Sequence, residues 1–149
     1  MLAKTLHKTT PLQRLSNLSV AENSIDPIIE ADHQPLKNVA YFFIIEGKRF
    51  IKIRYNEIVS IEASRCYINI HTTANRYLVI GSMVQLEKHL PRHLFCRIHR
   101  SWIVPVEGIS EIGTQRIRVN DQWFPLGTSF RRRLLTQVKP YVFNRSYFK

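Results

Sequence analysis

Cysteine and glycine are both scarce in this chain of 149 residues, and their scarcity excludes several classes of protein. Two cysteines, Cys66 and Cys96, cannot form the disulfide framework of a small secreted domain, so a reducing cytoplasm is the expected location. The five glycines never cluster into a loop that cradles phosphate, and no serine or cysteine stands in a recognisable nucleophile motif. The sequence therefore predicts a protein that is not an enzyme and has neither catalytic residues nor a cofactor.

Long apolar runs are also missing. No stretch approaches the ~18–20 apolar residues that a membrane-spanning helix needs, and the N-terminus lacks the apolar core of a signal peptide. Attachment to an anionic membrane surface is not favoured either, because no lysine-rich amphipathic helix with an exposed apolar face is evident. We therefore expect no membrane partner.

Acidic residues are few, at 11 against 22 lysines and arginines, and the imbalance is confined to one part of the chain. Four acidic and four basic residues cancel in residues 1–40, so residues 41–149 carry the whole net charge of +11. A compact domain this basic attracts polyanions through its summed field, which favours nucleic acid as the partner. The competing interpretation is a basic domain that has no role with nucleic acid.

The chain is long enough for one domain of about 100 residues and an extension. Residues 1–38 mix polar, charged and scattered apolar residues without a sustained period, which predicts a linker or flexible N-terminal arm. Residues 39–149 are then the folded domain. Short segments rich in β-branched and aromatic residues predict strands at Tyr41–Ile45, Arg49–Arg54, Ile58–Glu62, Tyr67–Thr72, Tyr77–Ile80, Ile109–Ile112, Arg116–Val119 and Trp123–Leu126.

Two helices are expected among these strands. Ser82 with Gln85 fits a capping box, which predicts a helix from Ser82 to about Leu90 that Pro91 ends. A final helix is expected after Ser129, with Ser129 as its cap or as a donor to phosphate. The predicted fold is mainly β, with short antiparallel strands, one internal helix and a C-terminal helix.

The segment Leu94–Val104 combines strand-forming residues with a polar, cationic centre. It reads as one β-strand, yet a strand that only built a core would not need Arg97, His99, Arg100 and Ser101. We therefore expect it to present one face or one end to an anionic partner. His89, His93, Cys96 and His99 are also residue types that bind zinc, but Pro91 interrupts the first pair and a strand turns the second pair to opposite faces, so no metal site is expected.

Arg131, Arg132 and Arg133 follow Ser129 directly and are expected in the first turn of the final helix. Three cations at the positive end of a helix cost a few tenths of a kcal/mol each unless an anion meets them. The functional interpretation is that phosphate oxygens contact these guanidinium groups and the free N–H groups of the helix end. The alternative is a solvated face without a ligand.

Three motifs in this order resemble the LytTR DNA-binding domain of bacterial response regulators, over about residues 40–138. They are Ile58-x2-Ile61-Glu62-Ala63 with Tyr67-Ile68-x-Ile70-His71, then Ser82-Met83-x2-Leu86-Glu87-x2-Leu90-Pro91 with Phe95-x-Arg97-Ile98-His99-Arg100-Ser101-Trp102-Ile103-Val104, and finally Pro125-Leu126-Gly127-x-Ser129-Phe130-Arg131. The receiver domain usual in that family is not expected here, because about 40 residues cannot hold a domain of about 120.

The resemblance implies an elongated β fold whose loops enter successive major grooves of double-stranded DNA. On this sequence the loops are residues 64–67, 99–101 and 128–132. Arg65 and Arg100 have the reach and fork geometry to read guanine. The expected phosphate contacts are made by Tyr67, Ser101, Thr128, Ser129, Arg131 and Arg132, with Ser64 beside them in the first loop. For His99, a role in orienting the Arg100 loop and a DNA contact remain equal alternatives.

The sequence thus predicts a sequence-specific regulator of transcription in a two-component system, bound to a promoter with repeated half-sites. It leaves open whether a sensor kinase or an anchored signalling partner supplies the input, and whether the protein dimerises on DNA. The competing class is an RNA-binding or single-strand-binding β module, which would need exposed aromatic residues among the cations. Because Tyr41, Phe42, Phe43 and Phe50 are expected in the core, the duplex DNA interpretation is preferred.

Overall fold

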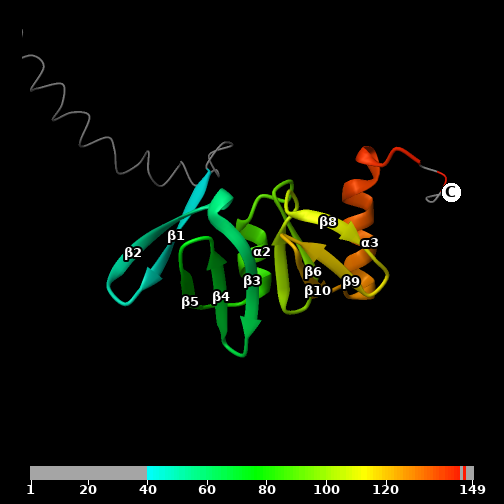
Figure 1. Ribbon diagram of the computed structural model, residues 1–149. Helices are drawn as coiled ribbons and strands as arrows, with labels where there is room; N and C mark the ends of the chain where they lie inside the picture. The colour runs from blue at the N-terminus through cyan, green and yellow to red at the C-terminus, as the bar shows by residue number, and fades with distance from the viewer. Residues whose placement is uncertain (1–39, 145, 147–149) are drawn as a thin grey trace, which may run out of the picture. The chain divides into compact units, whose positions relative to one another are not determined.

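The computed structural model describes residues 40–144 and 146, and this part of the chain contains ten strands in three antiparallel sheets, with two α-helices (Figure 1). The strands are β1 (Tyr41–Glu46), β2 (Arg49–Arg54), β3 (Ile58–Ser64), β4 (Tyr67–Thr72), β5 (Arg76–Ile80), β6 (Phe95–His99), β7 (Trp102–Pro105), β8 (Ile109–Ile112), β9 (Arg116–Val119) and β10 (Gln122–Pro125). The helices are α2 (Met83–His89) and α3 (Thr128–Val138), with short 3-10 turns at Tyr55–Glu57 and Lys139–Tyr141. The mainly β prediction with an internal and a C-terminal helix is confirmed.

A five-stranded sheet with the order β5-β4-β3-β7-β6 occupies the middle of the described unit. The β1–β2 hairpin lies on one side of it, and the three-stranded sheet β10-β9-β8 lies with α3 on the other (Figure 1). Because β3 pairs with β4 on one edge and with β7 on the other, the turn after β3 and the turn before β7 lie at the same end of the sheet.

The segment Leu94–Val104 forms a hairpin, so the prediction of one continuous strand was wrong. β6 ends at His99 and β7 begins at Trp102, with Arg100 and Ser101 as the turn between them. The turn contains no glycine, proline, asparagine or aspartate, and Ser101 is its only residue of a type that is common in turns. The polar centre of the segment is therefore the tip of a hairpin.

The β6–β7 hairpin separates two hydrophobic cores, which explains why it is apolar on both faces. Phe95 and Ile103 pack into a core with the β3–β4 strands and α2. Cys96, Ile98 and Val104 face a second core with the three-stranded sheet and α3. Residues that alternate along a strand point to opposite faces, so one hairpin contributes to both cores.

The two α-helices begin differently. Ser82 caps α2 as expected, and its side chain accepts a hydrogen bond of 3.2 Å from the backbone N–H of Gln85. α3 begins at Thr128 with Gly127 at the N-cap and no side-chain cap, so the prediction that Ser129 caps the helix was wrong. A Cβ at Gly127 would come within 2.9 Å of the Phe130 ring, because the chain enters α3 too closely for a side chain.

The β1–β2 hairpin exposes aromatic residues that the sequence interpretation had assigned to the core. Phe43 and Phe50 are 55% and 72% exposed, so their assignment to the core was wrong, whereas Ile44 and Ile53 on the other face are buried. One face of the hairpin packs against the first core, and the face that carries Phe43 and Phe50 is left in solvent. Within the described residues no helix is long and apolar enough to cross a membrane.

Candidate nucleic-acid interface

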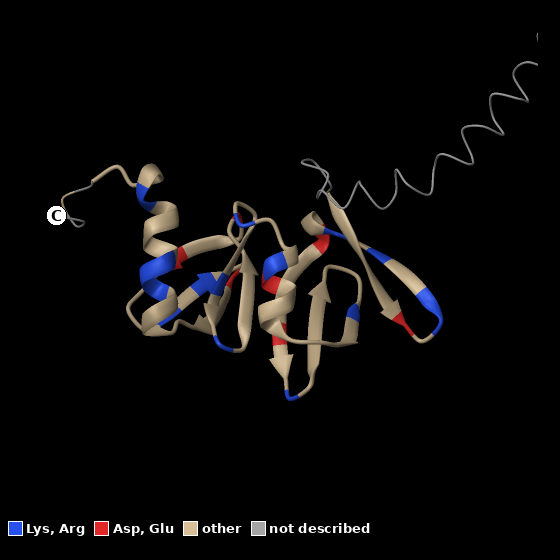
Figure 2. Ribbon diagram, turned by 180° about the vertical axis from the view of Figure 1, so that it is seen from behind, with Lys and Arg blue, Asp and Glu red and all other residues tan. Residues whose placement is uncertain are grey.

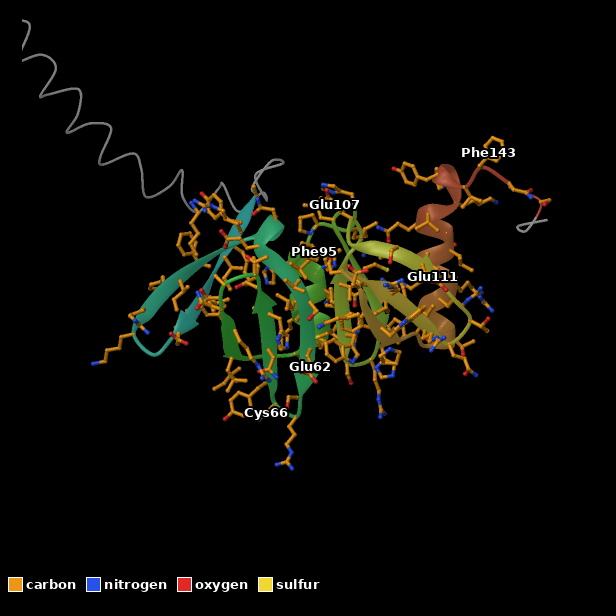
Figure 3. The ribbon with its side chains drawn as sticks, in the orientation of Figure 1. Glu62, Cys66, Phe95, Glu107, Glu111 and Phe143 are labelled. Carbon is orange, nitrogen blue, oxygen red and sulfur yellow. The ribbon has the colours of Figure 1, made fainter. Side chains whose placement is uncertain are left out.

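The β3–β4 turn presents Arg65 and Cys66 at its tip, between the paired residues Ser64 and Tyr67. All four are exposed to solvent. Arg65 has a φ of 57°, a left-handed conformation that is uncommon for a residue other than glycine. Such backbone conformations concentrate at functional sites, and the residue that adopts this one is an exposed arginine at the tip of the turn. Figure 3 shows the labelled Cys66 at this tip and Glu62 further back along β3.

The β6–β7 turn is held by its own side chains. His99 is half-buried, and its Nδ1 accepts a hydrogen bond of 3.2 Å from the backbone N–H of Ser101. Arg100 between them is exposed. Of the two roles left open for His99, this contact supports orientation of the turn, which aims the Arg100 side chain into solvent.

The start of α3 supplies a third polar segment. Thr128, Ser129 and Arg132 are exposed, whereas Arg131 is half-buried and donates from Nε to the Gly113 carbonyl over 3.0 Å. Because α3 begins at Thr128, the three arginines start at its fourth residue, so their placement in the first turn was wrong. The backbone N–H of Arg131 donates within the helix to the Gly127 carbonyl and is not available to phosphate.

Backbone hydrogen bonds hold these three segments next to one another. The N–H of Ala63 donates to the Ser101 carbonyl over 2.9 Å, which joins the β3–β4 and β6–β7 turns. The N–H of Gly127 donates to the Ile98 carbonyl over 2.9 Å, which brings the start of α3 against the end of β6. In Figure 2 the basic tips of the two turns point to the same side. The residues predicted from three separate motifs therefore lie along one side of the unit.

Arg97 was named from the sequence among the polar residues that indicate an anionic partner, but the structure places its side chain behind the turn and paired with a carboxylate. Its side chain is only 13% exposed and lies 5.4 Å from the centre of the Phe130 ring. It donates from Nη2 to the Arg100 carbonyl over 2.9 Å and from Nε to the His99 carbonyl over 3.4 Å. Arg97 thus positions the β6–β7 turn from behind. The sequence does contain a signal for this role. Arg97 stands between strand residues that are expected to be buried, and a charged side chain in such a place needs an oppositely charged partner.

That partner is Glu87 on α2. Its carboxylate accepts from Arg97 at 3.1 Å and from Arg133 on α3 at 2.6 Å, so one side chain joins α2, β6 and α3. Partial burial acts to raise the pKa of Glu87, but the hydrogen bonds and charges of Arg133 and Arg97 outweigh it and hold the pKa below the ordinary value of 4.5. The carboxylate therefore stays ionised at neutral pH.

Replacement of this carboxylate tests its pH-dependent contribution. Since the folded-state pKa is lowered, the ionised form stabilises the fold above pH 4.5, and this stabilisation disappears as the pH falls through the folded-state pKa. Glu87→Gln is expected to lower the free energy of unfolding at pH 7 by about 1–2 kcal/mol. Urea unfolding followed by tryptophan fluorescence at pH 7 and at acid pH measures the difference, which should vanish in acid. If the wild type and Glu87→Gln differed in unfolding free energy by the same amount at both pH values, the stabilising role of the ionised carboxylate would be contradicted.

Cys96 lies behind the interface and does not contribute to it. Burial raises the pKa of its thiol to about 11, assisted by the charge of Glu87 and opposed by that of Arg133. The thiol is therefore neutral at physiological pH, and neither a metal ligand nor a nucleophile is expected at this position.

Comparison with known proteins places this arrangement in a family. The protein-family model that describes the LytTr DNA-binding domain matches residues 48–137 of this chain. The sensory transduction protein LytT of Bacillus subtilis (strain 168) is 32% identical over 66 residues, which are 44% of this chain and 27% of that protein. This chain therefore matches only about a quarter of the length of that relative.

The fold also has a counterpart among solved structures. The LytTr DNA-binding domain of a putative methyl-accepting/DNA response regulator from Bacillus cereus superposes with a TM-score of 0.57 at 19% sequence identity. The match covers 68% of this chain and 98% of that domain. The likeness in fold thus extends over almost the whole of the solved domain.

Proposed function

Because this chain belongs to the family of LytTr DNA-binding domains, we propose that it is a transcription regulator that binds double-stranded DNA of specific sequence. The observation that carries the proposal is the alignment of the β3–β4 turn, the β6–β7 turn and the start of α3 along one side, held by backbone hydrogen bonds. Each of the three segments contributes at least one exposed arginine, namely Arg65, Arg100 and Arg132.

The proposed mechanism begins with electrostatic capture by the basic domain, followed by insertion of the turns into successive major grooves. Arg65 and Arg100 stand at turn tips, where their guanidinium forks can meet the O6 and N7 atoms of guanine. Contacts to the phosphates set the position of the domain along the duplex. We assign them to Ser64, Tyr67, Ser101, Thr128, Ser129, Arg131 and Arg132. His99 and Arg97 orient the central turn.

Salt dependence tests the proposal directly. Each phosphate that a lysine or arginine neutralises should add about 0.9 to the slope of log affinity against log salt. Fluorescence anisotropy with a labelled duplex is therefore expected to show a linear plot with a slope of about −3 or steeper. Affinity that does not change between low and high salt would refute the nucleic-acid interface.

A single-strand-binding function is the second candidate, because the β1–β2 hairpin exposes the aromatic residues that such a function requires. Phe43 and Phe50 are exposed, and Lys52 lies over the Tyr41 ring at 3.8 Å. Bases can stack on such a surface. The same titration with single-stranded DNA and RNA separates the candidates. Tighter binding to single strands, lost in Phe43→Ala and Phe50→Ala, would favour the second.

We further propose that residues 1–38 form an arm outside the DNA-binding domain and that the protein pairs on repeated half-sites. These residues lie outside the part of the chain that the structure describes. Removal of residues 1–38 is expected to leave the affinity for one half-site nearly unchanged, and to weaken binding only on two linked half-sites, where the second contact is effectively intramolecular. Gel-shift series on one and two half-sites measure this. A large loss on a single half-site would show that the arm contacts DNA or completes the fold.

A further inference from the structure

A cavity of about 550 Å³ lies between α2, the loop that follows it, the β6–β7 hairpin and α3. This volume is within the range of about 300–1,000 Å³ that is usual for sites of small organic ligands. Its apolar wall includes Leu90, Phe95 and Ile103, all of them buried in the first core. Phe95 is labelled in Figure 3, beside α2. The cavity lies next to the proposed interface, and no role has been assigned to it above.

The polar part of the lining is strongly cationic. Arg92, Arg97, Arg132 and Arg133 contribute four positive charges, and Glu87 contributes one negative charge. Arg97 and Arg133 are both bonded to Glu87, but no salt bridge within the described residues involves Arg92 or Arg132. Two arginines thus remain at the rim of an apolar pocket to meet an anion, and an arginine fork binds a carboxylate in bidentate fashion.

The cavity shares residues with the proposed DNA interface. Arg132 borders the cavity from α3 and is also a proposed phosphate contact. Arg97 borders it from β6 and holds the carbonyl of Arg100 in the central turn. An anion in the cavity would neutralise Arg132 and compete with Glu87 for Arg97. Its binding and the binding of DNA therefore oppose each other.

We propose that this cavity binds a small organic acid with a compact apolar body and one carboxylate, and that its occupancy lowers the affinity for DNA. The part that concerns DNA rests on the function proposed above, whereas the binding of the acid does not. The apolar wall receives the body of the ligand, and Arg92 and Arg132 receive the carboxylate. The cavity is then an inhibitory effector site within the DNA-binding domain.

Calorimetric titration of the full chain with 4-phenylbutyrate tests the site without DNA. We expect saturable binding of one equivalent, at least tenfold tighter than that of 4-phenylbutanol, which has the same body and no carboxylate. Thr136→Trp fills the cavity from an exposed position of α3, and Arg92→Gln removes a rim charge; both should weaken binding about tenfold or more. Arg76→Gln on β5 removes an exposed arginine that does not line the cavity and should bind as the wild type does.

Anisotropy with labelled duplex in the presence of 4-phenylbutyrate then tests the coupling. The affinity for DNA is expected to fall about fivefold or more in the wild type and in Arg76→Gln, but not in Thr136→Trp. Absence of saturable binding in the wild type, or binding as tight as the wild type in both cavity variants, would overturn the site. Binding without a change in DNA affinity would overturn the effector role. A protein that bound no duplex even without the acid would refute the proposed function, and the calorimetry would still decide the site.

Discussion

Arg97→Ala is expected to destabilise the fold by about 2–3 kcal/mol, because charged hydrogen bonds contribute about 1.5–3 kcal/mol and removal of one member of a buried pair leaves the other uncompensated. The side chain is largely buried and donates to Glu87, to the His99 carbonyl and to the Arg100 carbonyl. Glu87 keeps its salt bridge to Arg133 in the variant, so the loss of stability is smaller than it would be if the carboxylate had no partner left. Urea unfolding followed by tryptophan fluorescence measures it.

The matched control is Arg49→Ala on β2. Arg49 also forms a salt bridge, with Glu46 at 2.9 Å, but its side chain is 76% exposed. Exposed pairs contribute about 0–1 kcal/mol, so this variant should stay close to the wild type. Equal destabilisation by both substitutions would mean that Arg97 is no more than another surface arginine.

The same Arg97 substitution should also affect DNA binding selectively. In this variant the His99 and Arg100 carbonyls lose their hydrogen bonds to Arg97, so the turn no longer holds the Arg100 side chain in position to meet a base. Affinity for the specific duplex is expected to fall more than affinity for a random duplex, in a titration at a temperature where the variant is folded. A proportional loss on both duplexes would limit Arg97 to a structural role.

Arg100→Ala is expected to lower the affinity for the specific duplex by about 1–3 kcal/mol, or about 5- to 150-fold, and to relax base preference. Arg100 is exposed at the tip of the central turn, and no side-chain contact of its own within the described residues supports the fold. The free energy of unfolding should therefore remain unchanged. This combination of lost affinity with intact stability distinguishes it from Arg97→Ala.

Arg132→Ala is the matched comparison for a phosphate contact. Arg132 is exposed on α3, and its removal should weaken binding to specific and random duplexes about equally, with a salt slope about one unit shallower. Anisotropy titrations with both duplexes at several salt concentrations measure the two variants side by side. If Arg100→Ala and Arg132→Ala changed the affinities for both duplexes in the same way, the proposal that Arg100 reads a base and Arg132 contacts a phosphate would be refuted.

Local features of the sequence were sufficient for much of the fold. The Ser82 cap acts over three residues, and the apolar periodicity of the short strands acts over two, so both can be recognised without knowledge of the tertiary structure. The turn at Asn120 and Asp121 has positive φ at both residues, as such residue types allow. The three polar segments could likewise be located from motifs, together with the basic character of residues 41–149.

Contacts between distant residues decided the rest. The turn between His99 and Trp102 contains no glycine, proline or asparagine, and both strands of the hairpin pack against both cores. Those cores are built from residues far away in the sequence, so local signals did not reveal the break. Phe43 and Phe50 have the composition of core residues, and only the absence of a covering element in the described unit exposes them. Gly127, and not Ser129, is the N-cap of α3, at a position where a Cβ would come within 2.9 Å of the Phe130 ring.

The sequence by itself determined that this chain contains a basic, mainly β domain of the LytTR type with three cationic segments, because composition, periodicity and motif order are local properties. Only the tertiary structure decided how these segments act together. Glu87 and Arg97 are ten residues apart and Arg133 is 46 residues beyond Glu87, yet they meet in one ion-pair network behind the central turn. A charge inside a protein must find its partner in space, and that partner is not marked by proximity in sequence.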